Sequence, residues 1–270
     1  MATITASMVN ELRSKTGQGM MECKKALTET GGDVEKAIEY FRKKGVKTSI
    51  TERTASEGRL SVGVSSDKKV GAIVMVNCNT DFTAKSDPVA KILQLAIDKL
   101  LKNPSAAVVD DPEVKNAVTT VAQQTGENVQ IGRASTLTAP EGGVVGSYIY
   151  VATGKIGALM SFKGSPSDEL VKQLGGHIAF HKPLGMRRED VSPDLVAKER
   201  EIAIEQAKAT GKPQNIAEKI AEGKMNSFFA ERVLPDQEFF NPQVFKGTVA
   251  NYLKQQNVEL VKYVLVEVGK

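Results

Sequence analysis

The sequence predicts an α+β protein in which a three-helix N-terminal domain precedes two related α+β subdomains, with an antiparallel helical hairpin inserted into the second. Three observations predict this architecture. The first 45 residues carry apolar side chains at helical spacing, the chain from residue 57 onward repeats a strand, turn and strand pattern, and a long charged helical stretch interrupts the second repeat. We expect domains at residues 1–55, 56–140 and 141–270, with the hairpin at about 193–229.

The N-terminal segment is predicted to form three short helices around one small core. Gly17 can end the first helix, and Asp33 can cap the third. A basic stretch at residues 42–54 follows, which we interpret as a linker helix or a tether. The residues expected to face the core, at helical spacing, are Met8, Leu12, Met20, Cys23, Leu27, Val34, Ala37, Ile38 and Phe41.

An internal repeat indicates that the two larger subdomains are related. Residues 57–73 and 141–159 both begin with Glu-Gly and end in a segment of the form Lys-Val/Ile-Gly-Ala-Ile/Leu. Each copy predicts a β-hairpin, followed by a helix around 89–101 in the first and 168–180 in the second. Alternating apolar and charged residues predict a closing strand at 258–268.

The charged stretch within the second subdomain is predicted to be a pair of helices, broken by Gly-Lys-Pro at 211–213. Asn215 and Glu218 have the spacing of a capping box for the second helix. The pattern favours a projecting antiparallel hairpin, and two helices lying flat on the subdomain are the alternative. The expected contact stripes are Leu195, Ile202 and Ala209 on the first helix, and Ile216, Ala217, Ile220 and Ala221 on the second.

Composition indicates a cytoplasmic protein without a metal site. No apolar run approaches the roughly 20 residues of a membrane span, and the N-terminus lacks the features of a signal peptide. The two cysteines, Cys23 and Cys78, lie far apart in apolar surroundings and are interpreted as reduced core thiols. The two histidines, His177 and His181, share a helical face without further ligands nearby, so we expect structural roles for them.

The net charge of +4 is concentrated near the N-terminus. Residues 1–54 hold ten Lys and Arg against seven Asp and Glu, a net charge of +3. A small basic domain can bind RNA, an acidic membrane surface or an acidic protein patch. Charge alone therefore leaves the partner open.

Sequence motifs of enzymes and nucleotide-binding proteins are absent. Gly154-Lys155 and Gly223-Lys224 lack the upstream glycine and the following hydroxyl of a GxxxxGK[ST] phosphate loop. There is no Gly-x-Ser-x-Gly motif, and neither cysteine has a signature that links it to a histidine. With 5% aromatic residues and no Trp, the sequence shows no RNA-binding aromatic pattern. We therefore expect no enzyme, no cofactor, no directly bound nucleotide, and a protein rather than a nucleic acid as partner.

Two long motifs and several shorter ones stand out in the sequence. The first reads Leu-Arg-Ser-Lys-Thr-Gly-Gln-Gly-Met-Met-Glu-Cys-Lys-Lys-Ala-Leu at residues 12–27, and the second reads Val-Asn-Cys-Asn-Thr-Asp-Phe-Thr-Ala-Lys at residues 76–85. In this order they resemble the signatures of the bacterial-type elongation factor Ts family. Shorter matches that extend the resemblance over essentially the whole chain are Gly126-Glu127-Asn128, Gly146-Ser147-Tyr148, Gly211-Lys212-Pro213 and Ile216-Ala217-Glu218-Lys219.

The resemblance implies a guanine nucleotide exchange factor of translation elongation, which binds elongation factor Tu and promotes GDP release through protein contact. It implies a ubiquitin-associated-like fold for the three-helix domain. It also makes Asp81 and Phe82 the tip that enters elongation factor Tu. The residues alone allow another interpretation, because Thr80-Asp81 is also a helix N-cap and Phe82 could lie in the core.

Further partner contacts are expected in the N-terminal domain and in the second subdomain. Met20 and Met21 point roughly 100° apart on a helix, so both cannot be buried in so small a domain. The resemblance favours these two residues and Arg13 as contacts with elongation factor Tu. Tyr150 is a further candidate contact, and it stands where many relatives carry a His.

The chain departs from the family pattern in other places as well. Thr125 replaces an apolar residue, and Glu238 replaces a common proline. The sequence ends at Lys270, where some relatives continue into a further helical module, so we expect one contact with elongation factor Tu to be missing. The helical hairpin is the expected place for a homodimer contact. The alternatives to an exchange factor are a ubiquitin-associated-like adaptor for another helical partner and an RNA-binding protein.

Overall fold

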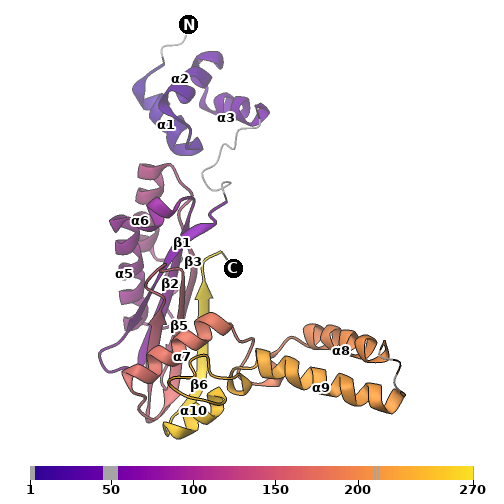
Figure 1. The fold of residues 1–270 in the computed structure, drawn as a ribbon. Coiled ribbons are helices and arrows are strands. Elements are labelled where there is room, and N and C mark those ends of the chain that lie inside the picture. Colours follow the sequence, from indigo (N-terminus) through magenta and orange to yellow (C-terminus); the bar gives the residue numbers. More distant parts are fainter. Residues whose placement is uncertain (1–3, 45–53, 210, 212, 270) are drawn as a thin grey trace.

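The N-terminal part of the computed structural model consists of three helices, α1 (Ala6–Thr16), α2 (Met20–Glu29) and α3 (Val34–Lys43), as Figure 1 shows. The structure describes residues 4–44, 54–209, 211 and 213–269. The predicted three-helix arrangement is confirmed, and Gly17 ends α1 in the left-handed region at φ 64°. Most of the predicted tether lies at residues 45–53, outside the described residues. The buried core of this part consists of Val9, Leu12, Cys23, Ala26, Leu27, Ala37 and Phe41.

One residue predicted for this small core lies outside it. Met20 is 55% exposed, whereas Cys23 and Leu27 on the same helix are fully buried. Met20 is the first residue of α2, and it therefore stands at the rim of the core. The prediction of Met20 as a core residue is wrong.

The first antiparallel sheet contains β1 (Glu57–Val64), β2 (Val70–Cys78) and β3 (Gln130–Thr138) in that order. The predicted hairpin is confirmed, because β1 pairs with β2 from Glu57 opposite Cys78 to Val64 opposite Gly71. The sequence patterns did not predict β3, whose small and polar side chains are mostly not buried. The helices of this subdomain are α4 (Asp81–Ala84), α5 (Asp87–Lys102) and α6 (Pro112–Thr125).

The second antiparallel sheet contains β4 (Gly143–Ile149), β5 (Ile156–Lys163) and β6 (Glu259–Glu267) in that order. Its hairpin and its closing strand were both predicted, and both are confirmed. The helix α7 (Asp168–His181) packs on β4, and this close approach requires a glycine. A Cβ atom on Gly175 would lie 2.2 Å from the Cβ of Tyr148. A further helix, α10 (Val249–Gln255), precedes the last strand.

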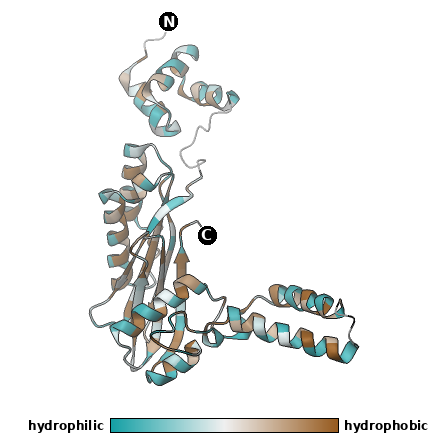
Figure 2. Cartoon of the chain, viewed as in Figure 1, coloured by the Kyte–Doolittle hydropathy of each residue, from teal (hydrophilic) through white to brown (hydrophobic). Residues whose placement is uncertain are grey.

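The two sheets pack against each other, and helices cover the outer face of each. Alternation along β2 shows this arrangement, because successive side chains of a strand point to opposite faces. Ile73 and Met75 contribute to the core shared by both sheets, whereas Val74 and Val76 contribute to the core under α5 and α6. Figure 2 shows the apolar residues concentrated in these inner strands. The predicted mixed α+β class is confirmed, while the exact domain boundaries stay a prediction.

The charged insert forms two packed helices, α8 (Pro193–Lys208) and α9 (Gln214–Arg232), that project from the second sheet (Figure 1). The predicted projecting hairpin is therefore confirmed, and the flat alternative is excluded. Short 3-10 helices at Arg188–Asp190 and Leu234–Asp236 lie on either side of it. At its base, the N–H groups of Leu184 and Leu234 donate to the carbonyl oxygens of Arg232 and Gly185. No helix among the described residues has the length and apolar character needed to cross a membrane.

The predicted contact stripe on α8 is wrong by one residue. Ile202 is exposed, and its neighbour Ala203 is buried against α9 together with Ala207. Alanine allows the helix axes to approach closely, so the contact follows the smallest side chains rather than the isoleucines. On α9 the predicted Ala217 and Ala221 are buried, but Ile216 is exposed.

The predicted capping box on α9 is also wrong. The helix begins at Gln214 with Pro213 as its N-cap, and no side chain caps it. Asn215 therefore lies inside the first turn and cannot cap the helix. Glu218 accepts a hydrogen bond from the side chain of Gln214 at 3.1 Å instead.

Candidate functional site

An exposed turn after β2 presents the ring of Phe82 to solvent. The strand ends at Cys78, and Thr80 is the N-cap of the single-turn helix α4, where its hydroxyl accepts the N–H of Thr83 at 3.3 Å. Asp81 is the first residue of that helix. Phe82 is 83% exposed, so the interpretation of this residue as part of the core is wrong, whereas the predicted N-cap is confirmed.

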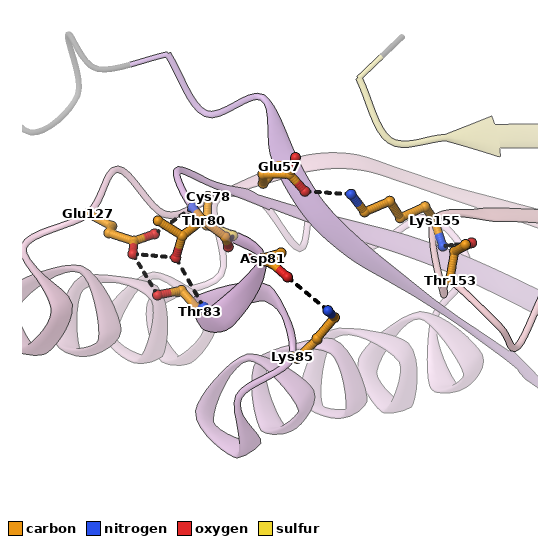
Figure 3. Close-up of polar contacts among 9 residues, drawn as sticks. All are labelled: Glu57, Cys78, Thr80, Asp81, Thr83, Lys85, Glu127, Thr153 and Lys155. Atoms are coloured by element: carbon orange, nitrogen blue, oxygen red, sulfur yellow. Dashed lines mark hydrogen bonds and ion pairs between the residues drawn. The ribbon is translucent and has the colours of Figure 1, made fainter.

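The carboxylate of Glu127, in the connection between α6 and β3, holds this turn (Figure 3). Its Oε2 accepts the backbone N–H groups of Asn79 and Thr80 at 3.0 and 3.1 Å. Its Oε1 accepts the hydroxyls of Thr80 and Thr83 at 2.7 and 2.8 Å. One side chain thus satisfies four donors, before and after Phe82 in the sequence.

A glycine and an asparagine bring Glu127 to this position. Gly126 ends α6 in the left-handed region at φ 69°, and the chain then turns toward β3. The Oδ1 of Asn79 accepts the N–H of Asn128 at 2.7 Å, and its Nδ2 donates to the carbonyl of Thr54 at 2.8 Å. Asn79 therefore links the turn both to the segment that leads into β3 and to the segment that leads into β1.

Two ion pairs lie at or near the turn that carries Phe82. The ammonium of Lys85 lies 2.8 Å from the carboxylate of Asp81, and this hydrogen bond holds the pKa of Asp81 below its usual value. Beside the turn, Glu57 at the start of β1 pairs with Lys155, the residue before β5, as Figure 3 shows. An exposed aromatic ring on a turn with charged side chains suits contact with another protein.

Behind the turn, Cys78 is a buried thiol with no nucleophilic character. Its Sγ donates to the carbonyl of Thr80 at 3.1 Å. Burial raises the pKa of Cys78 to about 11, so the thiolate is scarcely populated near neutral pH. Cys23 is likewise free and buried, which confirms the predicted core thiols.

In the N-terminal domain, the structure exposes both adjacent methionines. Met20 is 55% and Met21 is 74% exposed. Arg13, in the last turn of α1, is also exposed. These three predicted contact residues are therefore accessible, although they lie on a different domain from Phe82.

The second subdomain carries an exposed aromatic patch formed by Tyr150, Phe180 and Phe240. Tyr150 and Phe180 meet edge to face with ring centroids 6.1 Å apart, and Phe180 stacks on Phe240 at 6.4 Å. Phe180 is 66% exposed. Phe180 was not among the contact residues predicted from the sequence. Its position off the buried stripe of α7 was the signal that could have found it.

The two histidines have structural surroundings. His177 is buried, and its Nδ1 accepts the N–H of Phe240 at 3.2 Å, which places the proton on Nε2, 2.9 Å from Oε1 of Gln237. Burial lowers the pKa of His177 to about 4, so the ring is neutral. His181 stacks on it at 4.5 Å. Within the described part of the chain, no group of three His, Cys, Asp or Glu could hold a metal ion.

Comparison with known proteins identifies the family. The family model described as Elongation factor TS matches residues 65–270. The chain belongs to the elongation factor Ts family. It is 39% identical to Elongation factor Ts of Methylococcus capsulatus over 99% of this chain and 93% of that protein. It is 40% identical to the Elongation factor Ts proteins of Pseudomonas aeruginosa and Azotobacter vinelandii, over 100% of this chain and 92% of each relative.

Membership of the elongation factor Ts family gives the two motifs a structural context. The first motif spans α1 and α2 with the exposed methionines, and the second spans the end of β2 and the Phe82 turn. Membership confirms the family that the sequence resembled, and with it a non-enzymatic factor of translation elongation. The partner contacts of individual residues stay a prediction.

Proposed function

We propose that this protein is the guanine nucleotide exchange factor of elongation factor Tu, acting in the cytoplasm through protein contact alone. The observation that supports this most is the exposed ring of Phe82 on a turn held by Glu127. Phe82 and Asp81 enter elongation factor Tu and disturb the contacts that hold GDP and its magnesium ion. This chain handles the nucleotide through its partner.

The free energy of burying one aromatic ring is too small to account for the expected acceleration of GDP release. Accelerating GDP release about a thousandfold requires about 4 kcal/mol. Burying one Phe side chain contributes roughly 1.5–3 kcal/mol. Other contacts must therefore supply the rest of the free energy.

Two further surfaces are proposed to supply the remaining free energy. The N-terminal domain, with a ubiquitin-associated-like fold, binds through Arg13, Met20 and Met21, and exposed methionines suit such a contact because they are flexible and polarizable. The aromatic patch around Tyr150 provides the third surface. Because coupling between two ligands is reciprocal, bound GDP or GTP weakens the hold of this protein in turn, which lets GTP complete the exchange.

The experiment that tests the proposal measures release of a fluorescent GDP analogue from purified elongation factor Tu. We expect catalytic amounts of this protein to accelerate release about a thousandfold or more. Release at the spontaneous rate over a full concentration series would contradict the proposal. The adaptor alternative then predicts a different helical partner, and the RNA-binding alternative predicts retention on RNA that falls steeply with salt.

We also propose that a homodimer, where it forms, uses the helical hairpin. Exposed isoleucines lie on both of its helices at positions 202, 204 and 216. Sedimentation of the wild type and of Ile202→Glu/Ile216→Glu tests this. A wild-type dimer that the double substitution makes monomeric supports the proposal, and an unchanged sedimentation coefficient contradicts it.

A further inference from the structure

A single carboxylate fixes the backbone on both sides of Phe82. Glu127 accepts hydrogen bonds from Asn79 and Thr80, which precede the ring, and from Thr83, which follows it. The four distances lie between 2.7 and 3.1 Å. Glu127 lies in the connection between α6 and β3, 44 residues beyond Thr83 in the sequence. The turn is thus anchored to the subdomain at both of its ends.

The turn depends on this anchor for its conformation. The helix α4 has only four residues, too few to be stable alone, because helix nucleation is unfavourable. The ring of Phe82 is almost fully exposed, so its own packing does not set its direction. The direction of the ring follows from the backbone that carries it, and the bonds to Glu127 fix that backbone.

We propose that Glu127 is a positioning residue for nucleotide exchange, which holds Phe82 in its partner-entering orientation before the partner binds. The inference rests on the proposed function. Preorganisation of the turn removes the entropic cost of ordering it during association. When only a fraction of molecules presents the competent turn, the apparent dissociation constant rises by the inverse of that fraction, and the rate at saturation is unchanged.

The first test replaces Glu127 with Gln in the full chain. The amide has the same size, but its NH₂ group cannot accept hydrogen bonds as the second carboxylate oxygen does. In stopped-flow GDP release from elongation factor Tu, we expect the half-maximal concentration of this protein to rise about tenfold, with the maximal rate within about twofold of wild type. The matched control is Glu113→Gln on α6, whose carboxylate pairs with Lys99 away from the turn.

A second pair of variants tests the same anchor through a donor. Thr83 is buried, and Val has nearly its shape but no hydroxyl, whereas Ser keeps the hydroxyl. We expect Thr83→Val to raise the half-maximal concentration and Thr83→Ser to stay near the wild-type value. Equal effects of Val and Ser would contradict an action through the bond to Glu127.

A double substitution separates positioning from general stability. In a Phe82→Ala background the anchor has no ring to position, so Glu127→Gln should add little to the half-maximal concentration. The same increase in both backgrounds, or no increase in the wild-type background, would overturn the role of Glu127. If Phe82→Ala itself leaves the maximal release rate unchanged, the proposed entry of Phe82 fails, and the inference fails with it.

Discussion

Three titratable side chains keep one charge state at neutral pH, two of them at the Phe82 turn and one inside the second subdomain. The thiol of Cys78, with a pKa raised to about 11 by burial, stays protonated. The imidazole of His177, with a pKa lowered to about 4 by burial, stays neutral. The bond from Lys85 lowers the pKa of Asp81, which stays charged. These groups suit a fixed contact surface rather than proton transfer.

The buried imidazole of His177 predicts a loss of stability in acid. The native ring resists protonation, while the unfolded ring takes up a proton below pH 6.5. The contribution of His177 to the free energy of unfolding is therefore complete above pH 6.5 and is lost as the pH falls to about 4. The lowered pKa corresponds to about 3 kcal/mol of the free energy of unfolding. Denaturant unfolding of His177→Gln between pH 7 and pH 4 should show a correspondingly weaker pH dependence.

The matched control is Lys172→Gln, at an exposed position of the same helix, which leaves both histidines in place. This variant should keep the wild-type pH dependence. An unaltered pH dependence in His177→Gln would contradict the neutral buried ring.

The two buried thiols predict low reactivity in the native state. Burial raises the pKa of both Cys23 and Cys78, and both are inaccessible. At pH 8 a thiol reagent such as DTNB should react slowly with the native chain, and both thiols should react rapidly after unfolding in guanidinium. Rapid modification of a thiol in the native chain would show that a core opens readily.

At the scale of elements, the helical hairpin is held together by an alanine seam. Its core consists of Ala203 and Ala207 on α8, and Ala217, Ala221 and Met225 on α9. At its base, the guanidinium of Arg188 lies 4.8 Å from the centroid of the Phe229 ring and 3.6 Å from the carboxylate of Asp236. The seam and the base together fix the direction in which the hairpin projects.

Ala207→Leu should therefore destabilise the hairpin, because the larger side chain forces the helices apart. Overpacking of this kind costs about 1–3 kcal/mol. Hydrogen exchange of the α8 and α9 amides should report a lower free energy of local opening. Ala197→Leu, at an exposed position of α8, is the control and should leave exchange unchanged. An equal change in hydrogen exchange for both variants would contradict the role of the alanine seam in holding the hairpin together.

At the scale of the whole molecule, the proposed contacts lie on three separate units. The methionines are on the three-helix domain, Phe82 is on the first sheet subdomain, and the Tyr150 patch is on the second. Linking separate contacts raises overall affinity without any new interaction, because the later contacts form within one complex. Substitutions on different units should therefore change the affinity for elongation factor Tu and the acceleration of GDP release to different extents.

Substitution in the N-terminal domain tests this separation. Met20→Ala/Met21→Ala should raise the half-maximal concentration for GDP release by about tenfold or more, since two exposed hydrophobic contacts are lost. The maximal rate should fall by less than in Phe82→Ala, because Phe82 is intact and these contacts supply only the remaining part of the free energy. Lys36→Ala, at an exposed position of α3, is the control. A lower maximal rate with an unchanged half-maximal concentration would contradict the proposed division of roles.

The fold could be predicted where a periodic apolar pattern is strong. The β2 strand, the helices α5 and α7 and the three N-terminal helices have such patterns. By contrast, the side chains of β3 are mostly small or polar, and the buried stripe of α8 is made of alanine, which gives a weak hydrophobic signal. The strand β3 was therefore not predicted, and the contact stripe of α8 was placed one residue away from its true position.

The candidate site was predicted only where its residues are close together in the sequence. Asp81 and Phe82 lie in one continuous motif next to a predictable N-cap. Glu127 reaches the turn from 44 to 48 residues away, and a long-range hydrogen bond leaves no periodic trace in the sequence. The Gly126-Glu127-Asn128 motif could be seen, but its contact with the turn required the structure.

The role proposed for Phe82 is decided by the maximal rate of GDP release with Phe82→Ala at saturating concentration. Val109→Ala, at an exposed apolar position of the same subdomain, is the control. We predict that Phe82→Ala still forms a complex with elongation factor Tu, but that the maximal rate falls at least about tenfold, the equivalent of about 1.4 kcal/mol. A maximal rate equal to wild type, with the complex intact, would contradict it.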